Sequence, residues 1–139
     1  MKKHTPAPHY FTDDDGRRLV ALHVHGSDDR AVTEAALWDN AKRRHKLTGS
    51  LFLNHDGQGR SYVYAREPGT NKQSPLARLL LNLRRAYRVR YADRNPLNLL
   101  PENFRLVARW ADEGTAAEAL ALQLDSARQD TSATEGEQA

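Results

Sequence analysis

Eight arginines in the middle of this 139-residue chain are the residues best suited to bind another molecule. Positions 75–110 hold these arginines and only two carboxylates, Asp93 and Glu102, so this segment has a net charge of +6. The planar guanidinium group donates parallel hydrogen bonds to phosphate or carboxylate oxygens and is weakly hydrated. The segment therefore predicts a negatively charged partner. The eight residues are Arg78, Arg84, Arg85, Arg88, Arg90, Arg94, Arg105 and Arg109.

The C-terminal segment has the opposite charge. Positions 111–139 contain seven carboxylates and one arginine, a net charge of −6. A protein in which arginine is simply the common surface cation would have a similar composition. The charge pattern alone therefore leaves that interpretation open.

One stretch of the basic segment has a specific order of residues. Positions 89–104 read Val-Arg-Tyr-Ala-Asp-Arg-Asn-Pro-Leu-Asn-Leu-Leu-Pro-Glu-Asn-Phe. This order resembles, without a gap, the hallmark of phage-type HNH endonucleases, which runs Val-Asp-His, a short linker, Asn-Pro-Leu-Asp-Asn-Arg and then Pro-Glu-Asn-Leu. Positions 61–66 and 75–81 resemble a strand and a helix of the same family. The resemblance extends from about Tyr62 to Val107 and implies an HNH-like ββα unit.

The reactive groups of that family are missing at the matched positions. An HNH site needs a histidine that deprotonates water and a divalent ion held by Asp, His or Asn. The resemblance places the metal-binding Asp on Arg90, the general-base His on Tyr91 and the bracing Asn on Leu99. The helix His falls on Ala77, and Asn103 alone matches the last ligand. One amide oxygen cannot hold Mg²⁺ against water, so we expect no bound metal, no cofactor and no hydrolysis.

Arg90 and Asn103 each allow two interpretations. A guanidinium at the metal position would put a positive charge where the metal ion meets the phosphate, which predicts binding without cleavage. Alternatively, Arg90 is an outward residue of a short strand, paired with Asp93 or Glu102. Asn103, two residues after Pro101, could instead begin a helix or a turn.

Three histidines are a weaker candidate site. His23 and His25 share one face of a predicted strand, and His55 lies in a predicted hairpin turn. Two imidazoles do not define a metal site, and hydrogen bonds to backbone or solvent explain these residues as well. An enzyme site that combines all three histidines is a residual alternative.

Together these patterns predict a DNA-binding protein without nuclease activity, with DNA favoured over RNA. The alternative is an interaction protein of phage or mobile-element origin, which would use the same arginines to occupy an acidic or nucleic-acid-binding site of a host protein. The sequence does not determine the oligomeric state. The absence of cysteine fits the reducing cytoplasm, and no apolar run reaches the roughly 18 residues that a membrane span needs.

The length predicts one small α+β domain that positions these residues. Residues 1–12 are expected to form an arm, 13–125 the domain, with its HNH-like part at about 62–107, and 126–139 a disordered acidic tail. Local patterns predict an N-terminal strand over 18–25, a helix over 28–46 capped by Ser27, a hairpin of 51–54 with 61–65, a helix over 76–85 capped by Ser74, a strand over 87–91, a helical turn over 101–110 and a helix from 115.

We expect plasmid DNA to stay intact when it is incubated with the purified protein and Mg²⁺, Mn²⁺ or Ni²⁺, because the base and a metal ligand are missing. Agarose electrophoresis measures the nicked fraction. Reproducible nicking by the wild-type protein that disappears in Asn103→Ala would contradict the prediction and assign Asn103 to an active metal site.

Overall fold

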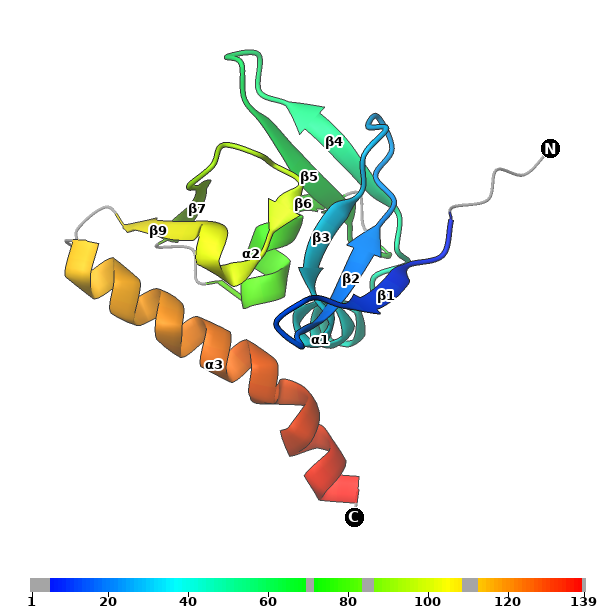
Figure 1. The fold of residues 1–139 in the computed structure, drawn as a ribbon, viewed down its shortest axis with the longest axis vertical. Helices are drawn as coiled ribbons and strands as arrows, with labels where there is room; N and C mark the ends of the chain where they lie inside the picture. The colour runs from blue at the N-terminus through cyan, green and yellow to red at the C-terminus, as the bar shows by residue number, and fades with distance from the viewer. Residues whose placement is uncertain (1–5, 70–71, 84–86, 109–112, 139) are drawn as a thin grey trace.

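Strands and helices surround one hydrophobic core in the computed structural model of the chain (Figure 1). The structure describes residues 6–69, 72–83, 87–108 and 113–138, and the side chains of α3 are described from 116 to 129. The class is α+β, as the sequence predicts. Among the described residues, no helix is long and apolar enough to cross a membrane.

The strands form three small sheets. The first sheet has the order β1 (His9–Thr12), β2 (Arg18–Leu22), β3 (Ala31–Glu34) and β8 (Asn98–Leu99). The second has the order β4 (Leu51–His55), β5 (Ser61–Arg66) and β6 (Gln73–Pro75), and β7 (Tyr87–Tyr91) pairs with β9 (Phe104–Ala108) in the third. All these pairs are antiparallel except β3 with β8.

The helices cover these sheets and meet one another. They are α1 (Ala35–His45), α2 (Leu76–Leu81) and α3 (Glu113–Gln138), and a 3₁₀ turn, η1 (Pro101–Asn103), precedes β9. α1 packs on β2 and β3 and also contacts α2 and α3, while α3 lies along β9. The core between them includes Trp38 and Phe104, whose side chains are fully buried.

The predicted hairpin and the predicted strand over 87–91 are both confirmed. Leu51 pairs with Ala65 and His55 with Ser61, and the turn between them contains Gly57 and Gly59 at positive φ. Such turns favour glycine because it has no side chain to clash with the backbone. The final helix is also confirmed, and it begins two residues earlier than predicted.

The prediction of a helix from residue 28 is wrong for residues 28–34, because α1 begins only at Ala35 and residues 31–34 form β3. In β3, Ala31 and Thr33 are buried and the two residues between and after them are half-buried, which is the two-residue period of a strand. Ser27 does not cap a helix, because its hydroxyl bonds to the backbone of Asp29 in a turn. Pairing with both β2 and β8 thus overrides the local capping signal.

Two predicted helix boundaries also require correction. α2 ends at Leu81, since Asn82 is left-handed (φ 51°) and its N–H donates to the carbonyl of Leu79. Ser74 belongs to β6, and its hydroxyl donates to Glu67 instead of capping α2. After η1 the chain extends as β9, so the helical turn predicted through residue 110 is wrong for 104–108.

Both ends of the predicted domain differ from expectation. Residues 9–12 of the expected arm form β1, where Tyr10 donates a hydrogen bond to Asp39 at 2.6 Å. The expected acidic tail begins inside α3, which continues to Gln138. Ala127 is 2% exposed, and its carbonyl accepts a hydrogen bond from Asn40 Nδ2 at 2.6 Å. Arg128 forms two hydrogen bonds to the carboxylate of Glu34, at 2.7 and 2.8 Å.

We expect deletion of residues 127–139 to lower the melting temperature by about 5 °C or more, because it leaves Asn40 without its acceptor and uncovers the core beneath Ala127. Deletion of residues 131–139 is the control, since it keeps the contacts of Ala127 and Arg128. Differential scanning calorimetry compares the two. Equal melting temperatures would contradict a structural role for this turn of α3.

Candidate anion-binding cleft

The pair of β7 and β9 has one apolar face and one basic face. Successive side chains of a strand point to opposite sides, so Val89 and Tyr91 face the core while Arg88 and Arg90 are exposed. Arg90 lies directly opposite Arg105 of β9. Like charges in directly opposed positions destabilise a sheet. The opposed arginines of this basic face therefore lower the stability of the folded protein, and packing of the core does not explain their presence.

The carboxylates of the basic segment do not neutralise these arginines. Glu102 accepts two hydrogen bonds of 3.0 Å from Arg17, which reaches it from the turn between β1 and β2. Asp93 accepts bonds from side-chain amides of its own loop. Among the described residues, the side chains of Arg88 and Arg90 have no hydrogen-bond or ion-pair partner. The pairing of Arg90 with Asp93 or Glu102 that the sequence left open is therefore not what the structure shows.

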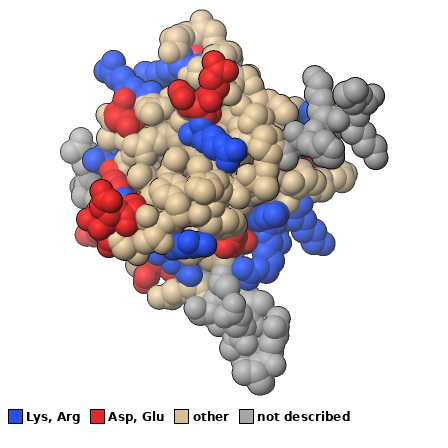
Figure 2. Space-filling view, turned by 45° about the vertical axis from the view of Figure 1, so that its right-hand side comes forward, with Lys and Arg blue, Asp and Glu red and all other residues tan. Residues whose placement is uncertain are grey.

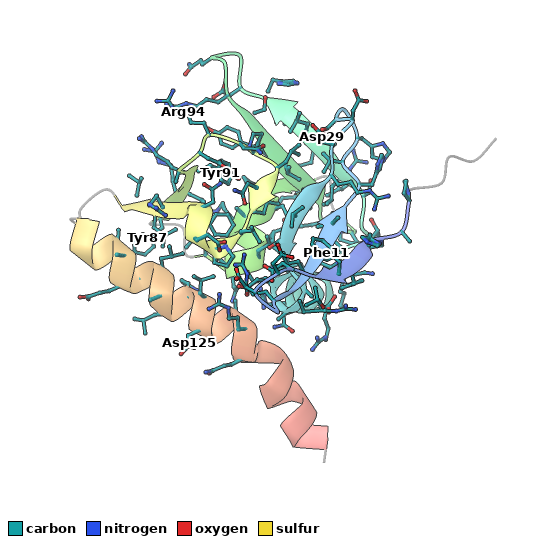
Figure 3. The ribbon with its side chains drawn as sticks, in the orientation of Figure 1. Phe11, Asp29, Tyr87, Tyr91, Arg94 and Asp125 are labelled. Atoms are coloured by element: carbon teal, nitrogen blue, oxygen red, sulfur yellow. The ribbon has the colours of Figure 1, made fainter. Side chains whose placement is uncertain are left out.

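A cleft of about 570 Å³ lies beside Arg90, between the turn of the β4–β5 hairpin and the loop that follows β7. Three arginines line it, and no lining residue carries a negative charge. Figure 3 labels Tyr91 and Arg94 in this region, below the tip of the hairpin. The lining residues are Gln58, Gly59, Arg60, Ser61, Tyr62, Arg90, Tyr91, Arg94 and Pro96.

Hydrogen bonds in the hairpin turn position Arg60. The Oδ1 atom of Asp56 accepts the backbone N–H groups of Gln58 at 2.7 Å and Arg60 at 3.1 Å. The backbone N–H of Asp56 donates in turn to the carbonyl of Arg60. The carboxylate is thus used by the turn, and the Arg60 side chain is exposed at the start of β5.

A second hydrogen-bonded loop positions Arg94. Asp93 accepts the N–H of Asn95 at 2.8 Å, and its other oxygen accepts the amide of Asn98 at 2.8 Å. These bonds stabilise the ionised carboxylate and lower the pKa of Asp93. Arg94 has φ +62°, which is uncommon for a residue with a side chain, and its N–H donates to the carbonyl of Tyr91 at 3.1 Å.

Asn103 joins the two ends of this loop. Its side chain donates to Asp93 Oδ1 and to the carbonyl of Asn98, both at 2.9 Å, and accepts the N–H of Asp93 at 2.9 Å. The residue is 5% exposed and does not line the cleft. Both amide hydrogens are already used, so Asn103 acts as a brace of the loop. This agrees with its interpretation as a turn residue.

Tyr91 and Tyr62 form an aromatic wall of the cleft. Their ring centroids are 6.1 Å apart, and the ring of Phe104 packs against Tyr91 from the core side at 6.2 Å. Burial, with smaller effects from Tyr62 and Tyr64, raises the pKa of Tyr91 above its ordinary value. Its hydroxyl therefore keeps its proton at neutral pH and can donate a hydrogen bond but not act as a base.

The other sequence-predicted positions lie elsewhere. Ala77 and Leu99 are core residues, 1% and 0% exposed. The guanidinium of Arg78 donates to the carbonyl of Tyr87 and so connects α2 to β7. Arg105 lies on the basic face and donates to the carbonyls of Glu102 and Phe104. Arg84, Arg85 and Arg109 lie outside the described residues.

Two of the three histidines contact each other, and the third contacts a serine of the hairpin. The rings of His23 and His25 meet edge to face at 4.9 Å, while His55 Nδ1 lies 2.6 Å from the hydroxyl of Ser61. Within the described part of the chain, no three His, Asp or Glu side chains are placed to hold a metal ion. Ser61 lines the cleft, so His55 supports a hydroxyl group of the site from outside.

Sequence reasoning missed Arg60 and Tyr62 as members of the site. The hairpin signal predicted where they lie, Arg60 in the turn and Tyr62 in β5. No local pattern connects the hairpin turn with the loop after β7. Comparison of the chain with known protein families, characterised proteins and solved structures finds no match. The assignment therefore depends on the geometry of the cleft.

We expect Asn103→Ala to lower the melting temperature by about 5 °C, because it leaves the backbone N–H of Asp93 and the carbonyl of Asn98 without their partner and removes a hydrogen bond to Asp93 Oδ1. Asn95→Ala is the matched control, since it removes one exposed hydrogen bond, to Leu97 N–H, in the same loop. Circular dichroism melts compare both variants. An equal, small effect of the two substitutions would show that the loop does not depend on Asn103.

Proposed function

We propose that this protein binds DNA through phosphate contacts in the cleft and on the adjacent basic face, and that it does not hydrolyse DNA. The observation that carries the proposal is the meeting of Arg60, Arg90 and Arg94 in one cleft lined by no carboxylate. Three such cations repel one another in the free protein, and an anion with several oxygens relieves that repulsion.

A phosphate ligand is favoured by the groups that accompany the arginines. Protein sites for nucleic-acid strands combine guanidinium groups for the backbone with aromatic rings for the bases, and here Tyr62 and Tyr91 supply the rings. On the face that Figure 2 presents, Lys and Arg are interspersed with Asp and Glu. In the cleft, by contrast, three arginines meet and no lining residue is acidic.

The resemblance to HNH endonucleases supports the same proposal. β7, the loop after it, η1 and the start of β9 carry the stretch on which the resemblance depends. Arg90 and Tyr91, which stand at the positions of the metal-binding Asp and the general base, both line the cleft. On this proposal a guanidinium replaces the metal ion as the partner of the phosphate, and a protonated phenol replaces the base. The protein would act in the cytoplasm.

We expect Arg60→Ala, Arg90→Ala and Arg94→Ala each to weaken DNA binding and to reduce the slope of log K against log salt by about one. Arg66→Ala is the matched control, because Arg66 is exposed at the opposite end of β5 and lies outside the cleft. Fluorescence anisotropy at several salt concentrations measures both quantities, with a duplex that carries a single-stranded overhang as the probe.

The stability of these variants separates a binding role from a structural role. Arg90→Ala removes the repulsion across the strands from Arg105, so its melting temperature should equal or exceed that of the wild-type protein. Weaker binding by a variant of unchanged stability supports the proposal. Wild-type affinity and salt slope in the triple variant would overturn it and would favour a protein partner for the arginines.

A further inference from the structure

The cleft has the dimensions of a small-molecule site. Its volume of about 570 Å³ lies within the range of pockets that enclose one organic ligand. A DNA duplex is instead bound across an open surface of roughly 1,000 Å² or more, with its phosphates on the outside of a cylinder. The basic face of β7 and β9 can bind the outside of a DNA duplex. The cleft itself suits a nucleotide that has left the double helix.

The wall of the cleft offers a rigid aromatic surface. Tyr62 is half-buried and lies against Tyr91, and Tyr91 is held in turn by the fully buried Phe104. This connection to the core orients the rings before any ligand arrives, which reduces the entropy lost on binding. An aromatic ring beside arginines is the arrangement on which unpaired bases stack, largely without regard to their sequence.

The polar groups of the cleft suit one nucleotide with its neighbouring phosphates. Arg60 comes from the hairpin, and Arg90 and Arg94 come from the facing segment, so guanidinium groups are available from both segments that line the cleft. Gln58 and Ser61 add an amide and a hydroxyl, which can bond to the edge of a base or to a sugar.

We infer that the cleft receives one unpaired nucleotide of a DNA strand, with the base stacked on Tyr62 and the flanking phosphates bound by Arg60, Arg90 and Arg94. This inference rests on the proposed function and adds to it the structural form of DNA that the site selects. A flipped nucleotide, an overhang and a single strand all present this chemistry. A free nucleotide monophosphate presents part of it.

Anisotropy titrations with three DNA probes test the inference: a blunt duplex, the same duplex with one extrahelical nucleotide, and the same duplex with a short overhang. We expect the two probes with unpaired nucleotides to bind about tenfold more tightly than the blunt duplex. Tyr62→Leu should lose this preference, so that it binds the three probes with similar affinity, and Tyr62→Phe should keep the preference. Tyr64→Leu is the control, since Tyr64 lies two residues along β5 and outside the cleft.

A base analogue, 2-aminopurine, reports stacking directly when it occupies the unpaired position. Its fluorescence should fall on binding to the wild-type protein and to Tyr62→Phe, and should stay high with Tyr62→Leu. Thermal melts and circular dichroism spectra of the Tyr62 variants show whether they are folded.

Three outcomes would overturn the inference. The first is equal affinity for all probes with no effect of Tyr62→Leu. If the arginine variants still bind DNA more weakly, this outcome rejects the inference but not the proposed function. The second is that a free nucleotide monophosphate displaces the overhang probe at a concentration equal to that of the probe. The ligand of the cleft would then be a free nucleotide and not a DNA strand. The absence of binding to any probe would remove the proposed function together with the inference.

Discussion

The buried amide of Asn103 holds together the segment on which the rest of the site depends. Its three hydrogen bonds connect Asp93 at the start of the loop with Asn98 at the end of it. Asn98 begins β8, which pairs with β3, so the same contacts link the two-stranded sheet to the four-stranded sheet. Any other arrangement of the loop would leave the partners of this buried amide without hydrogen bonds. The free-energy penalty of the unpaired groups makes the observed arrangement specific.

The loop held in this way includes features that work against stability. Arg94 has a positive φ, and Arg90 faces Arg105 across the strands without a neutralising carboxylate. Both features raise the free energy of the folded protein relative to a sequence without them. Proteins retain such destabilising features at sites where they serve function, such as ligand binding. The costs coincide with the lining of the cleft, which supports a binding role for it.

Local patterns in the sequence predicted the elements whose geometry is decided within a few residues. The glycines at 57 and 59 permit a tight turn, so the β4–β5 hairpin and its strands could be located. Alternation of apolar and basic residues located β7. The same reasoning failed at 31–34 and at 104–108, where pairing with distant strands overrides helix-like signals. Contacts from α1 likewise order the turn of α3 that the composition predicts to be disordered.

The sequence by itself determined that this protein has an excess of arginine in one segment. Only the tertiary structure decided which cations share a site. Arg60 and Arg90 are thirty residues apart, one in the β4–β5 turn and the other in β7, and the guanidinium of Arg78, equally basic in the sequence, donates to the carbonyl of Tyr87. The physical reason is that a phosphate site requires guanidinium groups within a few ångströms of one another, a distance set by the packing of sheets and not by local pattern.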